Sequence, residues 1–200
     1  VGGIVGVATG KSGTISHTLE GCSNSGLVTT TSTGATGGIV GQMTFSSVSD
    51  CSNSGSVEGK NLAGGIGANV GKTQFSRCFN EGSVTAATHA GGIAGTGALG
   101  FESCGNAGAV TVKGGTTNGA TAGGIGGVST GASGSTLVIE NCYNTGTVTN
   151  EEAGARAAGL IGMPTLTATP FDEVVCTVSN SYNAGIIRAS NGGEAYALVG

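Results

Sequence analysis

The chain has 200 residues, of which 42 are glycine and only 9% are charged. Its net charge of −4 comes from 11 acidic and 7 basic residues that are scattered singly, so there is no basic patch of the kind that binds nucleic acid. No apolar run approaches the roughly 18 residues of a membrane-spanning helix. The composition therefore argues against nucleic-acid binding and membrane insertion, and the length suits a single domain.

Two short motifs alternate along the whole chain. The first is a Gly-Gly-aliphatic pentapeptide such as 37–41, and the second is Cys-x-Asn-x-Gly-x-Val, as at 51–57. The repeats begin near residues 2, 37, 64, 91, 123 and 158, and a partial copy begins at 196. Spacings of 27 to 38 residues are typical of a solenoid, in which each coil buries its apolar face only by stacking on the next.

Each coil is predicted to contain three short strands. Gly, Ser, Thr and Val dominate, and apolar residues do not recur at the 3.6-residue spacing of a helix. In the second coil the inward residues of these strands are Ile39, Val48 and Val57, and β-branched residues suit a pleated strand. We therefore predict an all-β parallel β-solenoid (β-helix) of about six coils without capping elements, which forms one domain over residues 1–200.

The Asn position of the second motif is filled in all six coils, and the Cys position in five. Stacked amides can hydrogen-bond from one rung to the next, which predicts a structural ladder. In-register thiols point alike rather than at one another, so we expect reduced cysteines that fill the core. The ladder residues are Cys22, Cys51, Cys78, Cys104, Cys142, Asn24, Asn53, Asn80, Asn106, Asn144 and Asn183, whereas Cys176 lies outside the column.

Catalytic and cofactor motifs find little support. The glycine-rich segment 95–100 is followed by a strand rather than a helix, and 67–73 has three residues instead of four between its P-loop glycines. With Asp50 and Asp172 as its only aspartates, the chain offers few carboxylates for acid–base work. A linear column of thiols also lacks the convergent ligands of a metal site. We expect no catalytic residue, no cofactor and no metal.

Differences between the coils cluster at two corners, where loops could bind a partner. The insertions fall at 113–121, 129–136, 150–157 and 164–175. The candidate binding residues in them are Lys113, Thr117, Asn118, Glu151, Glu152, Arg156, Phe171 and Asp172. Both ends of the chain are in phase with the repeat, which predicts a fragment of a longer protein or a stacking subunit with Ile4, Val5, Leu198 and Val199 at its edges.

The motifs resemble those of a known family. Gly-Ile-Val-Gly at 3–6 and 38–41 and Gly-Ile-Ala-Gly at 92–95, each followed by Cys-x-Asn-x-Gly-x-Val, are similar to the GLUG motif repeats. Such repeats occur in bacterial surface and secreted proteins, including adhesins and the non-catalytic regions of immunoglobulin A1 proteases. The resemblance implies a scaffold that is secreted or at the cell surface. No His-Glu-x-x-His is present, so protease activity is not carried over.

Three functions remain open on these grounds. The first is a non-enzymatic extracellular module of a bacterial surface protein, a rigid solenoid that displays its corner loops to a host protein or a glycan. The second is a self-assembling fibre subunit whose edge at 196–200 stacks on the edge at 1–6 of the next copy, a heterologous contact that does not close. The third is a carbohydrate-active β-helix.

Overall fold

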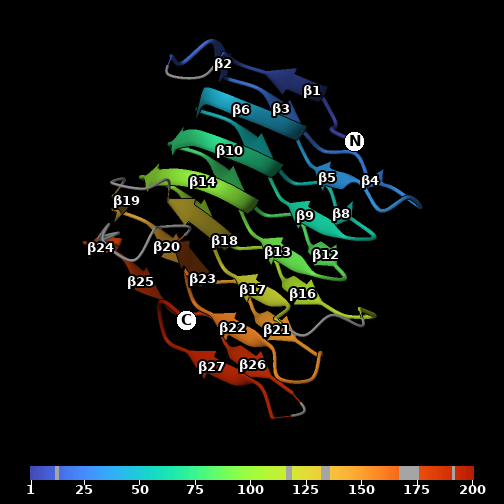
Figure 1. Ribbon diagram of the computed structural model, residues 1–200, viewed down its shortest axis with the longest axis vertical. Coiled ribbons are helices and arrows are strands. Elements are labelled where there is room, and N and C mark those ends of the chain that lie inside the picture. The colour runs from blue at the N-terminus through green and yellow to red at the C-terminus, as the bar shows by residue number, and fades with distance from the viewer. Residues whose placement is uncertain (12–13, 116–118, 132–135, 167–175, 191) are drawn as a thin grey trace.

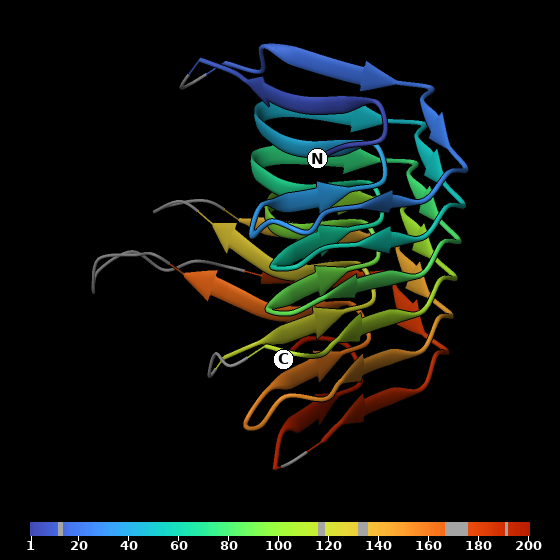
Figure 2. The same cartoon turned by 90° about the vertical axis from the view of Figure 1, so that its right-hand side faces the viewer.

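The computed structural model describes residues 1–11, 14–115, 119–131, 136–166, 176–190 and 192–200. Within these ranges the chain is all β, and each strand pairing is parallel. The chain winds into about six coils that stack along one axis (Figures 1 and 2), with the two ends at opposite ends of the stack. The predicted parallel β-solenoid is therefore confirmed.

The largest sheet has nine strands, and we call it the bent sheet. Its main order is β1-β6-β10-β14-β18-β23. Outside this order, β2 pairs with the second half of β6, β19 pairs with the second half of β14, and β24 pairs with β19. The strands are β1 (Val5–Thr9), β2 (His17–Glu20), β6 (Val40–Ser49), β10 (Gly67–Ser76), β14 (Ala94–Glu102), β18 (Gly126–Gly131), β19 (Leu137–Glu140), β23 (Ile161–Leu166) and β24 (Cys176–Ser179).

Three further sheets of six short strands complete each coil. The Asn sheet contains β3 (Ser23–Asn24), β7 (Ser52–Asn53), β11 (Phe79–Asn80), β15 (Gly105–Asn106), β20 (Tyr143–Asn144) and β25 (Tyr182–Asn183). The Val sheet contains β4 (Val28–Thr29), β8 (Val57–Glu58), β12 (Val84–Ala86), β16 (Val110–Val112), β21 (Val148–Asn150) and β26 (Ile187–Ala189). The Ala sheet contains β5 (Ala35–Gly37), β9 (Leu62–Gly64), β13 (His89–Gly91), β17 (Thr121–Gly123), β22 (Arg156–Ala158) and β27 (Glu194–Tyr196).

The corners depend on residues with positive φ. Strands β6, β10 and β14 continue through a bend at Phe45, Lys72 and Gly97, whose φ values are 52°, 56° and 90°. In the first, fifth and sixth coils an insertion replaces this bend, so the strand is split in two. Every coil then turns into the Asn sheet through one left-handed residue, namely Gly21, Asp50, Arg77, Ser103, Asn141 or Asn180.

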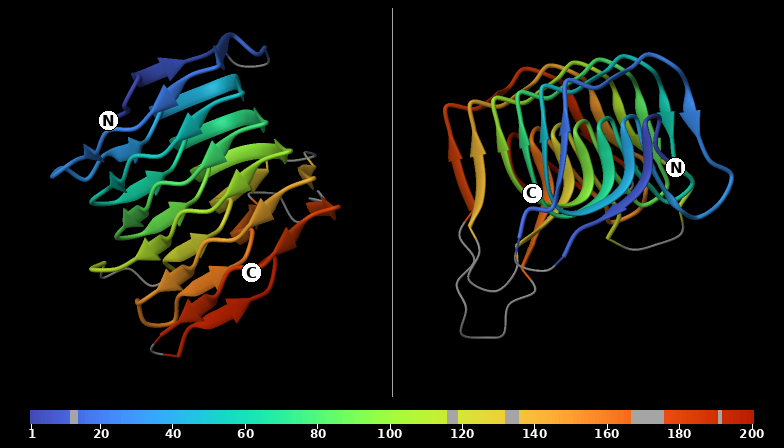
Figure 3. Two further views of the ribbon diagram at one scale, coloured as in Figure 1. Left: turned by 180° about the vertical axis from the view of Figure 1, so that it is seen from behind. Right: turned by 90° about the horizontal axis from the view of Figure 1, so that it is seen from above.

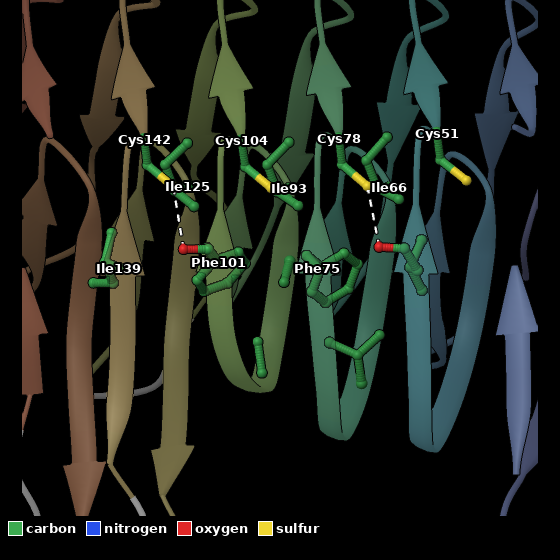
Figure 4. Close-up of a cluster of buried hydrophobic side chains, with 14 of the residues drawn as sticks. Cys51, Ile66, Phe75, Cys78, Ile93, Phe101, Cys104, Ile125, Ile139 and Cys142 are labelled. Atoms are coloured by element: carbon green, nitrogen blue, oxygen red, sulfur yellow. Dashed lines mark hydrogen bonds between the residues drawn. The ribbon is translucent and has the colours of Figure 1, made fainter. Parts of the chain in front are cut away.

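The coil encloses two separate cores. The larger one lies between the two halves of the bent sheet and the Asn sheet, and it contains stacked columns of Ile, Phe and Cys (Figure 4). In it the rings of Phe75 and Phe101 stack with centroids 5.6 Å apart. The smaller one contains the Val and Ala columns of the two sheets named after them. Ile39 points into the larger core as predicted, but it lies in the bend between β5 and β6 rather than in a strand.

Candidate functional site

The six Asn residues of the second motif form a continuous ladder. In the first five of them, Nδ2 donates a hydrogen bond of 2.7 to 2.8 Å to Oδ1 of the Asn in the next coil. In all six, Nδ2 also donates to the carbonyl of the glycine two residues on, at 2.7 to 2.9 Å. The four inner members are at most 1% exposed. The ladder therefore joins coil to coil and satisfies corner backbone groups, and its buried amides are not available to a ligand.

The second glycine of each Gly-Gly pair lies directly under this ladder. A Cβ added to Gly38 would stand 2.6 Å from Cγ of Asn53, and one added to Gly65 would overlap both Asn80 and the carbonyl oxygen of Gly92. The Asn amide can occupy this position only because the glycine carries no side chain. The two motifs thus recur together because their residues touch across the coil.

The cysteine column lies in the larger core. All six cysteines are free, and Cys51, Cys78, Cys104 and Cys142 are buried. Sγ of Cys78 donates to the carbonyl of Ser76 at 3.4 Å and to that of Val48 in the preceding coil at 3.5 Å, one of the bonds drawn in Figure 4. Hydrogen bonding to Cys142 and Cys78, together with burial, raises the pKa of Cys104. Cys104 is therefore a neutral group that fills the core, whereas hydrogen bonding to Cys104 and Cys51 lowers the pKa of Cys78.

Over the described ranges, no cluster of three or more His, Cys, Asp and Glu side chains is arranged to hold a metal ion. In the same part of the chain, no helix is long and apolar enough to cross a membrane.

Seen from above, the coils lie one behind another along the stack (Figure 3), and the described parts of the predicted binding loops fall at two places in the coil. Residues 113–115, 119–121 and 150–157 lie between strands of the Val sheet and the Ala sheet or at their ends, whereas 129–131, 136 and 164–166 lie at strand ends of the bent sheet. Lys113 and Glu151 are exposed. Glu152 accepts a hydrogen bond from the amide of Gly115 at 3.0 Å, which ties two successive loops together. The candidates Thr117, Asn118, Phe171 and Asp172 lie outside the described residues.

Arg156 is the predicted residue that the structure brings into a site. It lies on the outward column of the Ala sheet, in register with Thr121 in the coil before and Glu194 in the coil after. Its Nε is 3.4 Å from Oε2 of Glu194, which also accepts a 2.6 Å hydrogen bond from the Tyr196 hydroxyl. A hollow of about 340 Å³ opens here, bordered by Thr121, Arg156, Glu194, Met163 and the loop glycines of three successive coils.

The hollow is suited to binding rather than to acid–base chemistry. Hydrogen bonds from Tyr196 and then Arg156 lower the pKa of Glu194, so this carboxylate is ionised at neutral pH. A general acid would need its pKa raised toward neutrality. The volume is at the small end of the range for small-molecule sites. The sequence pointed to Arg156 but not to Glu194 or Tyr196, which belong to the next coil and become neighbours only once the coils are in register.

The predicted stacking residues occupy the two edge coils. Ile4 is 52% exposed, and Val5 pairs with Val40 of the second coil. At the other edge, the carbonyl of Leu198 accepts hydrogen bonds from Leu160 and Ile161, and Val199 bridges to Ile161. Each of these residues therefore contacts only the coil on its inner side.

Comparison with protein-family models, with curated proteins and with solved structures gives no match to this chain. The resemblance to GLUG repeats therefore rests on the motifs alone.

Proposed function

We propose that this chain is a non-enzymatic extracellular module of a bacterial surface protein, a rigid solenoid that presents its corner loops to a host protein or a glycan. The observation that carries the proposal is that the residues shared by all coils join the coils together, whereas the residues that differ between coils lie at the corners. The Asn ladder, the glycines beneath it and the Cys column hold the coils together. Insertions in the sequence fall at two corners, where Lys113 is exposed among the described residues.

The chemistry of the hollow supports the absence of catalysis. Its one described carboxylate, Glu194, is paired with Arg156 and Tyr196 and is held in the ionised form. The pair is solvent-exposed, with side chains 42% and 60% accessible, so it adds little to stability and is available to polar groups of a ligand.

The chain itself supplies the short corners with which to test the loops. Residues 113–120 can be replaced by 87–88, and 164–175 by 70–72, which are the equivalent segments of the third coil. We expect the shortened protein to keep its far-UV circular dichroism and thermal midpoint. It should lose binding to at least one of the immobilised mammalian glycans or extracellular-matrix proteins that the parent protein binds. Undiminished binding of the shortened protein would contradict the proposal.

One observation favours a second candidate, end-to-end stacking. At one edge of the ladder, Oδ1 of Asn24 has no Asn donor, and at the other Nδ2 of Asn183 has no Asn acceptor. The two edges are thus complementary, and each can add a coil from the same chain or from another copy. Light scattering at rising protein concentration tests this: assembly should occur and be blocked by Ile4→Lys, whereas a strict monomer at high concentration excludes self-stacking.

A further inference from the structure

A row of aromatic rings runs along the outside of the Asn sheet. It consists of Phe79 in β11, Tyr143 in β20 and Tyr182 in β25, which all follow the Cys position of their coils. The rings of Tyr143 and Tyr182 stack with centroids 5.7 Å apart and planes at 13°. Phe79 and Tyr143 are 6.2 Å apart and tilted by 41°. We call this row the aromatic strip; it crosses four successive coils.

Gly105 makes the strip continuous. It occupies the strip position of the coil between Phe79 and Tyr143, and a Cβ there would overlap the Tyr143 ring, with Cε1 at 2.7 Å. The ring therefore covers the bare backbone of Gly105 and reaches toward Phe79. Covering a sheet glycine with a neighbouring aromatic ring is a known stabilising device, but it does not account for Tyr182.

Tyr182 remains available to a ligand. It is 54% exposed, although it packs on Tyr143. Within the described part of the chain, no residue hydrogen-bonds the hydroxyl of Tyr143 or Tyr182. The surface thus offers the exposed ring of Tyr182 for apolar contact and two hydroxyls for hydrogen bonds, a combination typical of aromatic residues at binding surfaces.

The surroundings of the strip are almost uncharged. Two residues after each strip position stand Glu81, Ala107, Thr145 and Ala184. The nearest cation in sequence, Arg77, is held by Asp50 through hydrogen bonds of 2.8 and 2.7 Å. Among the described residues of the Asn sheet, a charged ligand would therefore find Glu81 as its unpaired partner, at one end of the strip. Glu102 and Glu140 stand at the corner that leads into this sheet, so the charges beside the strip are acidic and disfavour an anionic ligand.

The size of the strip also selects among ligands. A stable protein interface buries about 800 Å² on each partner. Three aromatic side chains supply at most about 150–250 Å² each, and here they already cover one another in part. Small residues flank them, so a protein partner would gain too little. A chain of sugar rings needs only a narrow row of stacking faces with hydroxyl groups beside them.

We propose that the aromatic strip binds an uncharged oligosaccharide laid along the solenoid axis, with sugar rings stacked on Tyr182 and Tyr143. The rungs repeat every ~4.8 Å, so successive coils can contact successive sugars. This inference rests on the proposed adhesive function and names its ligand as a glycan. It places the contact on the sheet, apart from the corner loops.

The composition of the chain provides a direct readout. It has no Trp and three Tyr, two of which are in the strip. In a Tyr196→Phe background all tyrosine fluorescence comes from Tyr143 and Tyr182. We would titrate this protein with cellohexaose, chitohexaose, laminarihexaose and maltohexaose. A saturable change in emission with at least one of them is expected.

Variants in the same background separate stacking from hydrogen bonding, with saturation-transfer NMR as the readout that all of them share. Tyr182→Ala should weaken binding at least tenfold, whereas Tyr182→Phe should retain most of the affinity because the ring remains. Ile186→Ala is the matched control, because Ile186 is 56% exposed in the same coil but outside the strip. It should bind like the parent.

The proposal is overturned if none of the four oligosaccharides binds, or if Tyr182→Ala binds as tightly as its control. The corner-shortened protein keeps the strip, so it distinguishes this inference from the proposed function. Oligosaccharide binding that survives shortening supports the strip even if the loops prove inert. Array binding that is lost on shortening but unchanged in Tyr182→Ala supports the loops and refutes the strip.

Discussion

Single residues in this solenoid are constrained mainly by how closely one backbone approaches another. Gly65 must lie under Asn80 and against the carbonyl of Gly92, so any side chain there would separate the coils. The corner into the Asn sheet has a different requirement, a positive φ, which Asp50, Arg77 and Ser103 meet at some steric cost. The residue at position 65 is thus limited by the atoms around it, whereas the corner residues are limited by the backbone conformation they must adopt.

Two glycines of the Gly-Gly motif should respond very differently to the same change. Gly65→Ala should lower the free energy of unfolding by about 3 kcal/mol, since backbone atoms and the ladder must shift to admit the methyl group. Gly6→Ala is the control, because a Cβ there meets no atom within 4 Å. It should leave stability unchanged or slightly increased. Urea denaturation measures both, and similar losses in the two variants would contradict the close packing seen at Gly65.

Among the structural elements, the Asn ladder separates the two cores and links every coil to the next. Asn80 accepts from Asn53 and donates to Asn106 and to the carbonyl of Gly82, and it is fully buried. Stacked coils in a solenoid contact chiefly their neighbours, so the loss of one rung acts on the interfaces to both sides.

Replacement of an inner Asn of the ladder should therefore lower the free energy of unfolding strongly. Asn80→Ala leaves one buried donor and two buried acceptors without their partner, at about 1–3 kcal/mol each, so we expect a loss of at least ~3 kcal/mol. Asn24→Ala provides the comparison at the edge of the ladder, where Gly26 is exposed and there is one Asn neighbour instead of two. It should lose less than half as much in urea denaturation. Equal losses would show that the ladder is not cooperative in the way its geometry indicates.

At the scale of the whole molecule, the thiol column makes stability depend on pH. Hydrogen bonding to Cys78, together with burial, raises the pKa of Cys51. Hydrogen bonding to Cys142 and Cys78, together with burial, raises the pKa of Cys104 in the same way. A raised pKa in the folded state means that the unfolded chain loses its thiol protons first. The contribution of these groups is thus fully present below the unfolded thiol pKa and is lost as pH rises above it.

The free energy of unfolding should therefore fall above pH ~8.5, by up to about 1.4 kcal/mol per pH unit for each of Cys51 and Cys104, the two thiols whose pKa is raised. Urea midpoints between pH 7 and 11 would measure the fall. Cys104→Ala is the control, because it removes one titrating group and should make the fall less steep. A stability that is constant or rises with pH would refute the neutral, buried column.

The repeat allowed much of the fold to be predicted. Cys51 and Asn53 recur in every coil or nearly so, and a residue that recurs in register in a solenoid must stack on its own copies. The bent sheet was not foreseen, because Phe45, Lys72 and Gly97 share a positive φ but no side-chain chemistry. The division of the interior into two cores was also not predicted, because the sequence shows which residues recur at inward positions but not which of these columns pack against each other.

The sequence by itself determined the coil, its ladder and the corners at which coils differ, because these follow from period and from identical residues in successive copies. Only the tertiary structure decided that Arg156 meets Glu194 and Tyr196, and that Tyr143 covers Gly105 and packs on Tyr182. Those residues are 38 to 40 positions apart in the sequence. Their contacts depend on how insertions of unequal length are absorbed at the corners while the rungs stay in register.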